Sequence, residues 1–162
     1  MNNLKELKKK YEELGKEIER LEKEKSCKRW RAKLRENYYC VGKTGDIVIL
    51  TDEFGGYDNF AYQTRNYFKT REEAQRHLDN INTYYELMDL AEELNAGKKI
   101  DWDNFNQNKY AISFDVQIKI LHQTNCRYYR GLREIYCLDE SFLKIALDKI
   151  GEERLESLFK EE

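Results

Sequence analysis

Several residues in this sequence are of types that could do chemistry. The stretch VGKTGD at 41–46 contains the Gly-Lys-Thr of a phosphate-binding loop. It lacks the first glycine of that motif, and it falls in a predicted hairpin turn instead of before a helix. The acid pairs Asp52/Glu53 and Asp101/Asp103 could act in acid–base catalysis, but such pairs serve more often as turn and capping residues. With no Ser-His-Asp order either, we expect that the protein is not an enzyme.

The cysteines and histidines could bind a metal if their spacing allowed it. His77 and His122 lie far apart in the sequence, and the cysteines show no C-x-x-C spacing. The cysteines are Cys27, Cys40, Cys126 and Cys137. We therefore expect free, buried or half-buried thiols, with no metal site and no cofactor.

The composition is that of a folded protein. Of the 162 residues, 13% are aromatic and 37% are charged, which is unlike a disordered tail or a membrane span. The N-terminus is rich in lysine and has no apolar signal-peptide core, so we expect a location in the bacterial cytoplasm. The charge is uneven, because residues 1–36 have 13 Lys and Arg against 8 Glu, whereas the rest of the chain has 16 against 23. This asymmetry indicates an interaction surface.

Residues 1–36 predict a long, coiled-coil-like helix. Apolar residues recur there at heptad spacing from Leu4 onward. The expected dimer seam comprises Leu7, Tyr11, Leu14, Ile18 and Leu21. The flanking charges favour antiparallel packing with a second copy or with another helix of the chain. The alternative is a single amphipathic helix that lies on its own domain.

The same helix is expected to continue through KSCKRWRAKLRENYYC, residues 25–40, up to residue 36. Cys27, Trp30 and Leu34 keep a helical apolar spacing there, so the basic residues fall on the other sides. The expected partner-binding residues are Lys28, Arg29, Trp30, Arg31, Lys33 and Arg35. They could bind a protein or phosphates, or they could form a solvated face.

The chain beyond residue 36 contains a weak internal repeat. The stretch 66–81 aligns with 134–150 at an offset of 69 residues, and Tyr39 aligns with Tyr110 at an offset of 71 residues. We therefore predict an α+β body at 37–162 that consists of two similar β-hairpin–strand–helix units with antiparallel sheet. The units are 37–97 and 108–162, and the N-terminal helix precedes them.

Local signals in the first copy agree with this arrangement. Lys43-Thr44-Gly45 predicts a hairpin turn with glycine at positive φ, and GGYDN at 55–59 predicts a loop. The next helix is expected to end at Asn95 with Gly97 after it. Its predicted buried stripe is Ala74, Leu78, Ile81, Tyr85, Met88 and Ala91.

Two further groups of residues are candidates for binding. The first hairpin and its loop present an acidic set, which we expect to compete for a basic channel on a partner. This set is Asp46, Asp52, Glu53 and Asp58. The stretch CRYYRGLR interleaves arginine with tyrosine, a pattern that suits base stacking or protein contact. Its candidate residues are Arg127, Tyr128, Tyr129, Arg130 and Arg133.

The stretches NYFKTREEAQRHLDNI, AEELNAGKKIDW and CLDESFLKIALDKIGEERLESLF resemble a pattern in small accessory proteins from phages and prophages of Gram-positive bacteria. The resemblance covers residues 37–160, and its motifs are helix caps and stripes. Some proteins of this loose group are anti-CRISPR proteins, which block a CRISPR effector nuclease by binding it. The resemblance transfers no active residues.

Three functions remain open at the level of sequence. The resemblance implies a phage-encoded counter-defence protein that binds a CRISPR effector, or its RNA-bound complex, without catalysis. The basic helix and the tyrosines instead fit an RNA- or DNA-binding phage protein. A binder of another host factor would have the same sequence features. The target, the CRISPR type and the oligomeric state do not follow from the residues.

Overall fold

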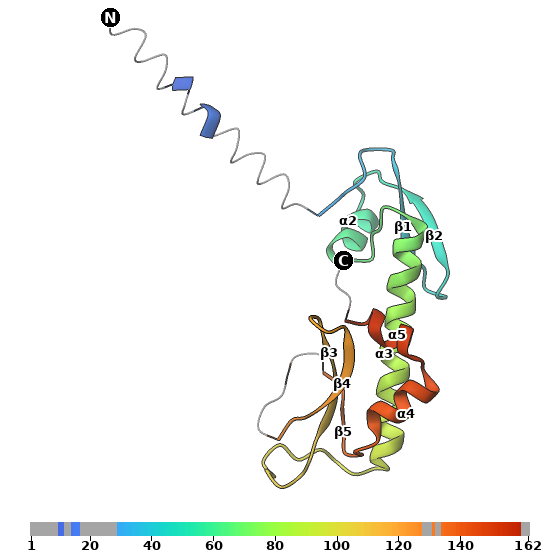
Figure 1. Cartoon of the computed structure of the whole chain (residues 1–162). Coiled ribbons are helices and arrows are strands. Elements are labelled where there is room, and N and C mark those ends of the chain that lie inside the picture. Colours follow the sequence, from blue (N-terminus) through green and yellow to red (C-terminus); the bar gives the residue numbers. More distant parts are fainter. Residues whose placement is uncertain (1–9, 12–13, 17–28, 128–130, 132–133, 160–162) are drawn as a thin grey trace, which may run out of the picture. The chain divides into compact units, whose positions relative to one another are not determined.

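The structure is a computed structural model that describes residues 10–11, 14–16, 29–127, 131 and 134–159 (Figure 1). Residues 10–11 and 14–16 are helical and exposed. The elements after residue 36 are β1 (Asn37–Val41), β2 (Ile47–Thr51), α2 (Gly56–Gln63), α3 (Arg71–Asn95), β3 (Tyr110–Asp115), β4 (Ile120–Asn125), β5 (Tyr136–Cys137), α4 (Phe142–Lys149) and α5 (Glu152–Ser157).

The chain divides into two compact units. Unit 1 comprises residues 1–40 and 48–70, and unit 2 comprises residues 41–47 and 71–162. The division places α3 in unit 2, whereas the sequence repeat placed it with the first hairpin.

Unit 1 contains most of both strands of the β1–β2 hairpin, residues 37–40 and 48–51, whereas the turn at 41–47 is counted with unit 2. Tyr39 in β1 also forms an antiparallel bridge with Phe68, through N–H···O bonds of 2.9 and 2.8 Å. The short helix α2 lies in the sequence between β2 and Phe68. A small core closes the unit, and its buried residues are Ala32, Tyr38, Cys40, Ala61 and Tyr67. The hairpin turns at Gly45, whose φ of 79° is the positive value that the sequence predicted.

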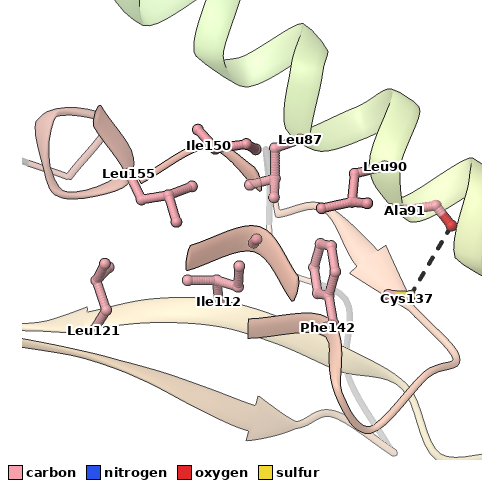
Figure 2. Packing of buried hydrophobic residues seen from close by; sticks show 10 residues of the cluster. Leu87, Leu90, Ala91, Ile112, Leu121, Cys137, Phe142, Ile150 and Leu155 are labelled. Atoms are coloured by element: carbon pink, nitrogen blue, oxygen red, sulfur yellow. Dashed lines mark hydrogen bonds between the residues drawn. The ribbon is translucent and has the colours of Figure 1, made fainter. Parts of the chain in front are cut away.

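Unit 2 has a three-stranded antiparallel sheet in the order β4-β3-β5. The strand β3 alternates, so that Ile112 and Phe114 face one side and Ala111 faces the other. Figure 2 shows the first side, where Leu87 and Leu90 of α3 point toward Ile112 and Phe142. Burial of such aliphatic and aromatic side chains stabilises the unit by roughly 1.5–3 kcal/mol per side chain.

The opposite face of the sheet packs on the loop between α3 and β3. Trp102 of this loop contacts Tyr136 edge-on at 4.9 Å between ring centroids. The loop is fixed by Lys109, whose fully buried ammonium donates to the carbonyls of Asn104 and Gln107 at 3.0 and 2.9 Å. The ammonium also lies 5.4 Å from the Trp102 ring.

The long helix α3 ends at Asn95, and Gly97 follows with a φ of 77°, as the sequence predicted. The predicted buried stripe is only partly right. Ala74 and Ala91 are buried, but Ile81 and Tyr85 are exposed. In the second half of α3 the buried residues are Thr83, Leu87, Leu90 and Ala91. These residues are buried because they face the sheet, even though bulkier apolar residues lie on other sides of the helix.

The predicted chain of elements needs correction. In the described part of the chain the longest helix is α3, not one at the N-terminus, and β1 and β2 precede it. Residues 29–36 are not helical: the backbone there is irregular, and Arg35 has a positive φ of 65°. Residues 56–63 form α2 where GGYDN predicted a loop, because Gly55 and Asp58 cap a helix start.

The two hairpins do share one feature. Tyr39 pairs with Phe68, and Tyr110 pairs with Cys137. These are the positions that the sequence alignment equates at its offsets of 71 and 69. The copies differ beyond their hairpins, since unit 1 inserts α2 before Phe68 and since α4 has 8 residues where α3 has 25.

Candidate functional site

A buried carboxylate organises unit 1. Asp52, which directly follows β2, is fully buried. Its Oδ2 accepts hydrogen bonds from Nε of Arg31 at 3.0 Å and from the hydroxyl of Tyr67 at 2.7 Å. Its Oδ1 accepts the N–H of Phe54 at 2.7 Å. Asp52 therefore joins the segment before β1, the end of β2 and the segment before α3.

These partners decide the charge state of Asp52. Burial pushes the pKa of the carboxyl up, but the hydrogen bonds from Arg31, Tyr67 and Phe54 outweigh it, so that the pKa lies below its ordinary value. The same bond raises the pKa of Arg31. An ionised pair with its hydrogen bonds satisfied is tolerated inside a protein, whereas a single charge there is not. We call Arg31, Asp52 and Tyr67 the Asp52 clasp.

The clasp fixes the backbone of the basic segment. The N–H of Ala32 donates to the hydroxyl of Tyr67 at 3.1 Å, and the N–H of Arg35 donates to the carbonyl of Asp52 at 2.7 Å. A terminal nitrogen of Arg31 donates to Oδ1 of Asn59 in α2 at 2.8 Å. Residues 31–35 thus lie along the hairpin end as an ordered, non-helical strap.

A second buried carboxylate supports α2. Asp58, in the first turn of the helix, accepts the hydroxyl of Tyr38 at 2.9 Å and the N–H groups of Glu53 and Gly55 at 3.1 and 3.0 Å. An acid at this position favours the positive end of the helix dipole. Burial, together with the bond to Asp58, raises the pKa of Tyr38.

The two carboxylates are linked by a ring stack. Tyr38 and Tyr67 are stacked, with 3.9 Å between centroids and 12° between planes. The Tyr62 ring contacts the Tyr67 ring edge-on, with 5.5 Å between centroids. The ring of half-buried Trp30 lies 5.7 Å from the Tyr67 ring, again between centroids. These ring contacts are part of the small core that holds α2 in unit 1.

Two arginine guanidinium groups lie over aromatic rings in this part of unit 1. The guanidinium of Arg31 lies 4.7 Å from the Phe54 ring and 5.1 Å from the Tyr62 ring. The guanidinium of Arg29 lies 4.0 Å from the Tyr62 ring. Arg29 is exposed, so its charge is available at the surface. Such pairs hold arginine side chains in fixed orientations.

Three aromatic side chains in or near these guanidinium–ring contacts are about half exposed to solvent. Phe54 is 47% exposed, Tyr57 is 55% exposed and Phe60 is 62% exposed. Tyr57 and Phe60 are three residues apart in α2, so they project from neighbouring positions of one helix face. We call Arg29, Phe54, Tyr57 and Phe60 the α2 surface. Aromatic and arginine side chains together are typical of binding hot spots.

The buried acids leave the exterior of this part of unit 1 basic. In its ranges 29–40 and 48–70, five cations and two anions are exposed. The exposed cations are Arg29, Lys33, Arg35, Arg65 and Lys69, and the exposed anions are Glu36 and Glu53. This excess of positive charge favours an acidic partner.

The basic residues predicted from the sequence have different environments. Arg29, Lys33 and Arg35 are exposed, whereas Arg31 is held by Asp52 and Trp30 packs against Tyr67. Lys28 lies outside the described residues.

The predicted acidic surface needs correction. Asp52 and Asp58 are buried with internal partners, so they cannot present charge to a protein. Asp46 and Glu53 are exposed, and the carboxylate of Asp46 accepts the hydroxyl of Thr44 within the turn.

The other predicted residues fall largely outside the described parts of the chain. Arg127 is exposed and donates to Asn108 at 2.9 Å. Tyr11 and Leu14 of the predicted dimer seam are exposed. The residues outside the description are Leu7, Ile18, Leu21, Tyr128, Tyr129, Arg130 and Arg133.

The α2 surface was not predicted from the sequence. Phe54, Tyr57 and Phe60 recur at a spacing of three, which a helical interpretation of FGGYDNFAY would have placed on one face. The paired glycines favoured a loop and obscured the pattern.

Within the described ranges, no group of three or more His, Cys, Asp and Glu side chains could hold a metal ion. Cys40, Cys126 and Cys137 are buried and are not in disulfides, as predicted for the cysteines. None of the helices in the described parts combines the length and the apolar character that crossing a bilayer requires.

A groove of about 490 Å³ lies between α3 and α5 in unit 2. Its charges are of both signs, with Arg71 and Arg76 near Glu72 and Asp79. Arg154 is already paired with Glu86 at 2.7 Å. The groove therefore has no single charge character that would select a ligand.

Comparison of the chain with protein-family models, with curated proteins and with solved structures returns no match.

Proposed function

We propose that this protein acts by binding another macromolecule through the α2 surface, and that it has no catalytic role. The observation that carries the proposal is the exposure of Phe54, Tyr57 and Phe60 on a frame that buried hydrogen bonds hold rigid. Burying three such rings against a partner removes a large apolar area from water. The cost in side-chain entropy is small, because aromatic side chains have few rotatable bonds.

The fixed strap also favours binding at this surface. Arg29 is stacked on Tyr62 and Arg31 is bonded to Asp52, so neither guanidinium has to be ordered when a partner binds. Preorganised side chains improve affinity because less freedom is lost on association. The Asp52 clasp thus supports binding by holding the strap against α2.

We propose a CRISPR effector nuclease, loaded with its guide RNA, as the partner. The support for this choice is the sequence resemblance to phage accessory proteins that include anti-CRISPR proteins. In this proposal the protein works in the cytoplasm of the bacterial host and inhibits the effector by occupying it. The basic exterior of unit 1 suits the acidic, RNA-containing face of such a complex.

Co-purification with a panel of CRISPR effectors, with and without guide RNA, tests the proposal. We expect one effector to be retained and its cleavage of target to stop at one inhibitor per effector. Complete inhibition at a small fraction of equimolar protein would indicate turnover and contradict the non-catalytic part. Failure to bind every effector, loaded or empty, would overturn the choice of partner.

Variants locate the contact. Phe60→Ala should weaken retention of the effector, because it removes the most exposed ring of the α2 surface. Tyr85→Ala is the matched control, since Tyr85 is 58% exposed on α3 in unit 2. Equal loss in both variants would contradict the assignment of the α2 surface.

A further inference from the structure

We infer that the α2 surface contacts an unpaired nucleic-acid strand. This inference rests on the proposed function, because it names the part of the target that the same surface touches. It concerns the chemistry of the contact, whichever effector supplies the strand.

Local charge favours a nucleic-acid strand. Asp52 and Asp58 of unit 1 are buried. In the ranges 29–40 and 48–70, five cationic and two anionic side chains are exposed to solvent. The whole chain has a net charge of −2, so this excess belongs to these ranges of unit 1 and does not reflect the overall composition. A local cation excess is what neutralises phosphates along a strand.

Flat groups in solvent favour unpaired bases over a duplex. Phe54, Tyr57 and Phe60 each leave about half of the side chain exposed, and Arg29 adds a planar guanidinium over Tyr62 at 4.0 Å. Bases of a single strand can separate and stack on such rings and guanidinium planes. Bases inside a duplex show only their edges, so a duplex cannot use these faces.

Arginine guanidinium groups and aromatic rings alternate in a series, and a nucleic-acid base could be added at its end. Along Phe54, Arg31, Tyr62 and Arg29, each guanidinium lies within 5.1 Å of the neighbouring ring centroid. Both ends of this series, Phe54 and Arg29, are exposed to solvent. A base placed on the Arg29 end would continue a stack that is formed before binding.

Fluorescence anisotropy with a labelled oligouridylate of about 20 nucleotides tests the inference on the full-length protein. We expect binding that weakens with salt. Phe60→Ala should weaken it about tenfold, as loss of one base–aromatic stack does. Arg29→Gln should also weaken binding, because it removes the guanidinium plane on which a base would stack.

Two variants in unit 2 serve as controls. Tyr85→Ala removes an exposed ring, and Lys144→Gln removes an exposed charge from α4. Neither should change the affinity by more than about twofold, because a surface that takes no part in binding contributes little. Circular dichroism of all four variants confirms that each is folded, so that a loss can be assigned to contact.

The outcomes separate this inference from the proposed function. No binding to oligouridylate, equal losses in the controls, a preference for duplex RNA of the same length, or equal binding of polyglutamate would each overturn the inference. If the effector is still retained when it carries no guide RNA, the proposed function stands without the nucleic-acid contact. If oligouridylate binds as expected and no effector is retained, the inference stands and the choice of effector falls.

Discussion

Arg31 and Asp52, which are 21 residues apart in the sequence, form a partly buried ion pair with 3.0 Å between Nε and Oδ2. The carboxylate has no exposure to solvent, whereas 27% of the Arg31 side chain is exposed. The pair fastens the strap of residues 31–35 to the hairpin and to Asn59 of α2. Arg31, a candidate for partner binding on the sequence alone, is thus held in an internal ion pair.

Asp52→Ala should lower the free energy of unfolding of unit 1 by about 3 kcal/mol, because it leaves the Arg31 guanidinium and the Tyr67 hydroxyl without their acceptor. Urea unfolding followed by circular dichroism measures the change. The adjacent Glu53→Ala removes an exposed carboxylate and should cost less than about 0.5 kcal/mol. Equal effects of the two substitutions would show that the clasp contributes nothing.

The clasp should also make the protein sensitive to acid. The pKa of Asp52 is lower in the folded protein than in the unfolded chain, so the stabilisation is present above the unfolded value near 4 and is lost as the pH falls through the folded value. Thermal unfolding between pH 7 and pH 2 should show this loss. Asp52→Asn should remove the part of the pH dependence that Asp52 contributes below pH about 4. An unchanged profile would mean that another acid is responsible.

Tyr67→Phe should destabilise the protein more than Tyr62→Phe. The Tyr67 hydroxyl is buried, donates to Asp52 and accepts from Ala32, so its removal leaves the buried N–H of Ala32 unsatisfied and takes one donor from the buried Asp52 carboxylate, at a cost of about 2 kcal/mol. The Tyr62 hydroxyl makes an exposed bond to the carbonyl of Arg29 at 2.9 Å, and its loss should cost about 0.5 kcal/mol. Chemical unfolding ranks the two variants, and the reverse order would refute this role of Tyr67.

Lys109→Met should loosen the loop between α3 and β3 in unit 2. The substitution keeps the length of the side chain but removes the donor to the Asn104 and Gln107 carbonyls and the cation beside Trp102. In a Trp30→Phe background the emission of Trp102 should shift to longer wavelength, since the ring gains access to water. Lys99→Met at an exposed position of the same loop is the control. An emission spectrum that the Lys109 substitution does not alter would contradict this description of the loop.

Features set by neighbouring residues could be predicted from the sequence. The hairpin turn at Gly45 and the end of α3 before Gly97 depend on a positive φ, which glycine adopts at little cost. A hairpin at the start of the second unit was also predicted, and β3 and β4 form one, although β4 begins at Ile120 and so includes only the end of the QIKIL stretch. Such local signals act regardless of the rest of the fold.

Features set by distant residues could not be predicted in this way. The apolar spacing of Trp30 and Leu34 suggested a helix, but hydrogen bonds to Asp52 and Tyr67 hold this segment as an irregular strap. Tertiary contacts of this kind override helix propensity, which is worth only tenths of a kcal/mol per residue. The burial of Asp52 and Asp58 likewise depends on Arg31 and Tyr38, which no local pattern connects to them.

Photo-crosslinking tests the central claim, that the α2 surface is the binding surface, most directly. A benzoylphenylalanine side chain is introduced in place of Phe60 in one variant and in place of Tyr85 in another, and each is irradiated with the RNA-loaded effector. We predict a covalent adduct from position 60 and none from position 85. The absence of an adduct from position 60, with or without one from position 85, would contradict the claim.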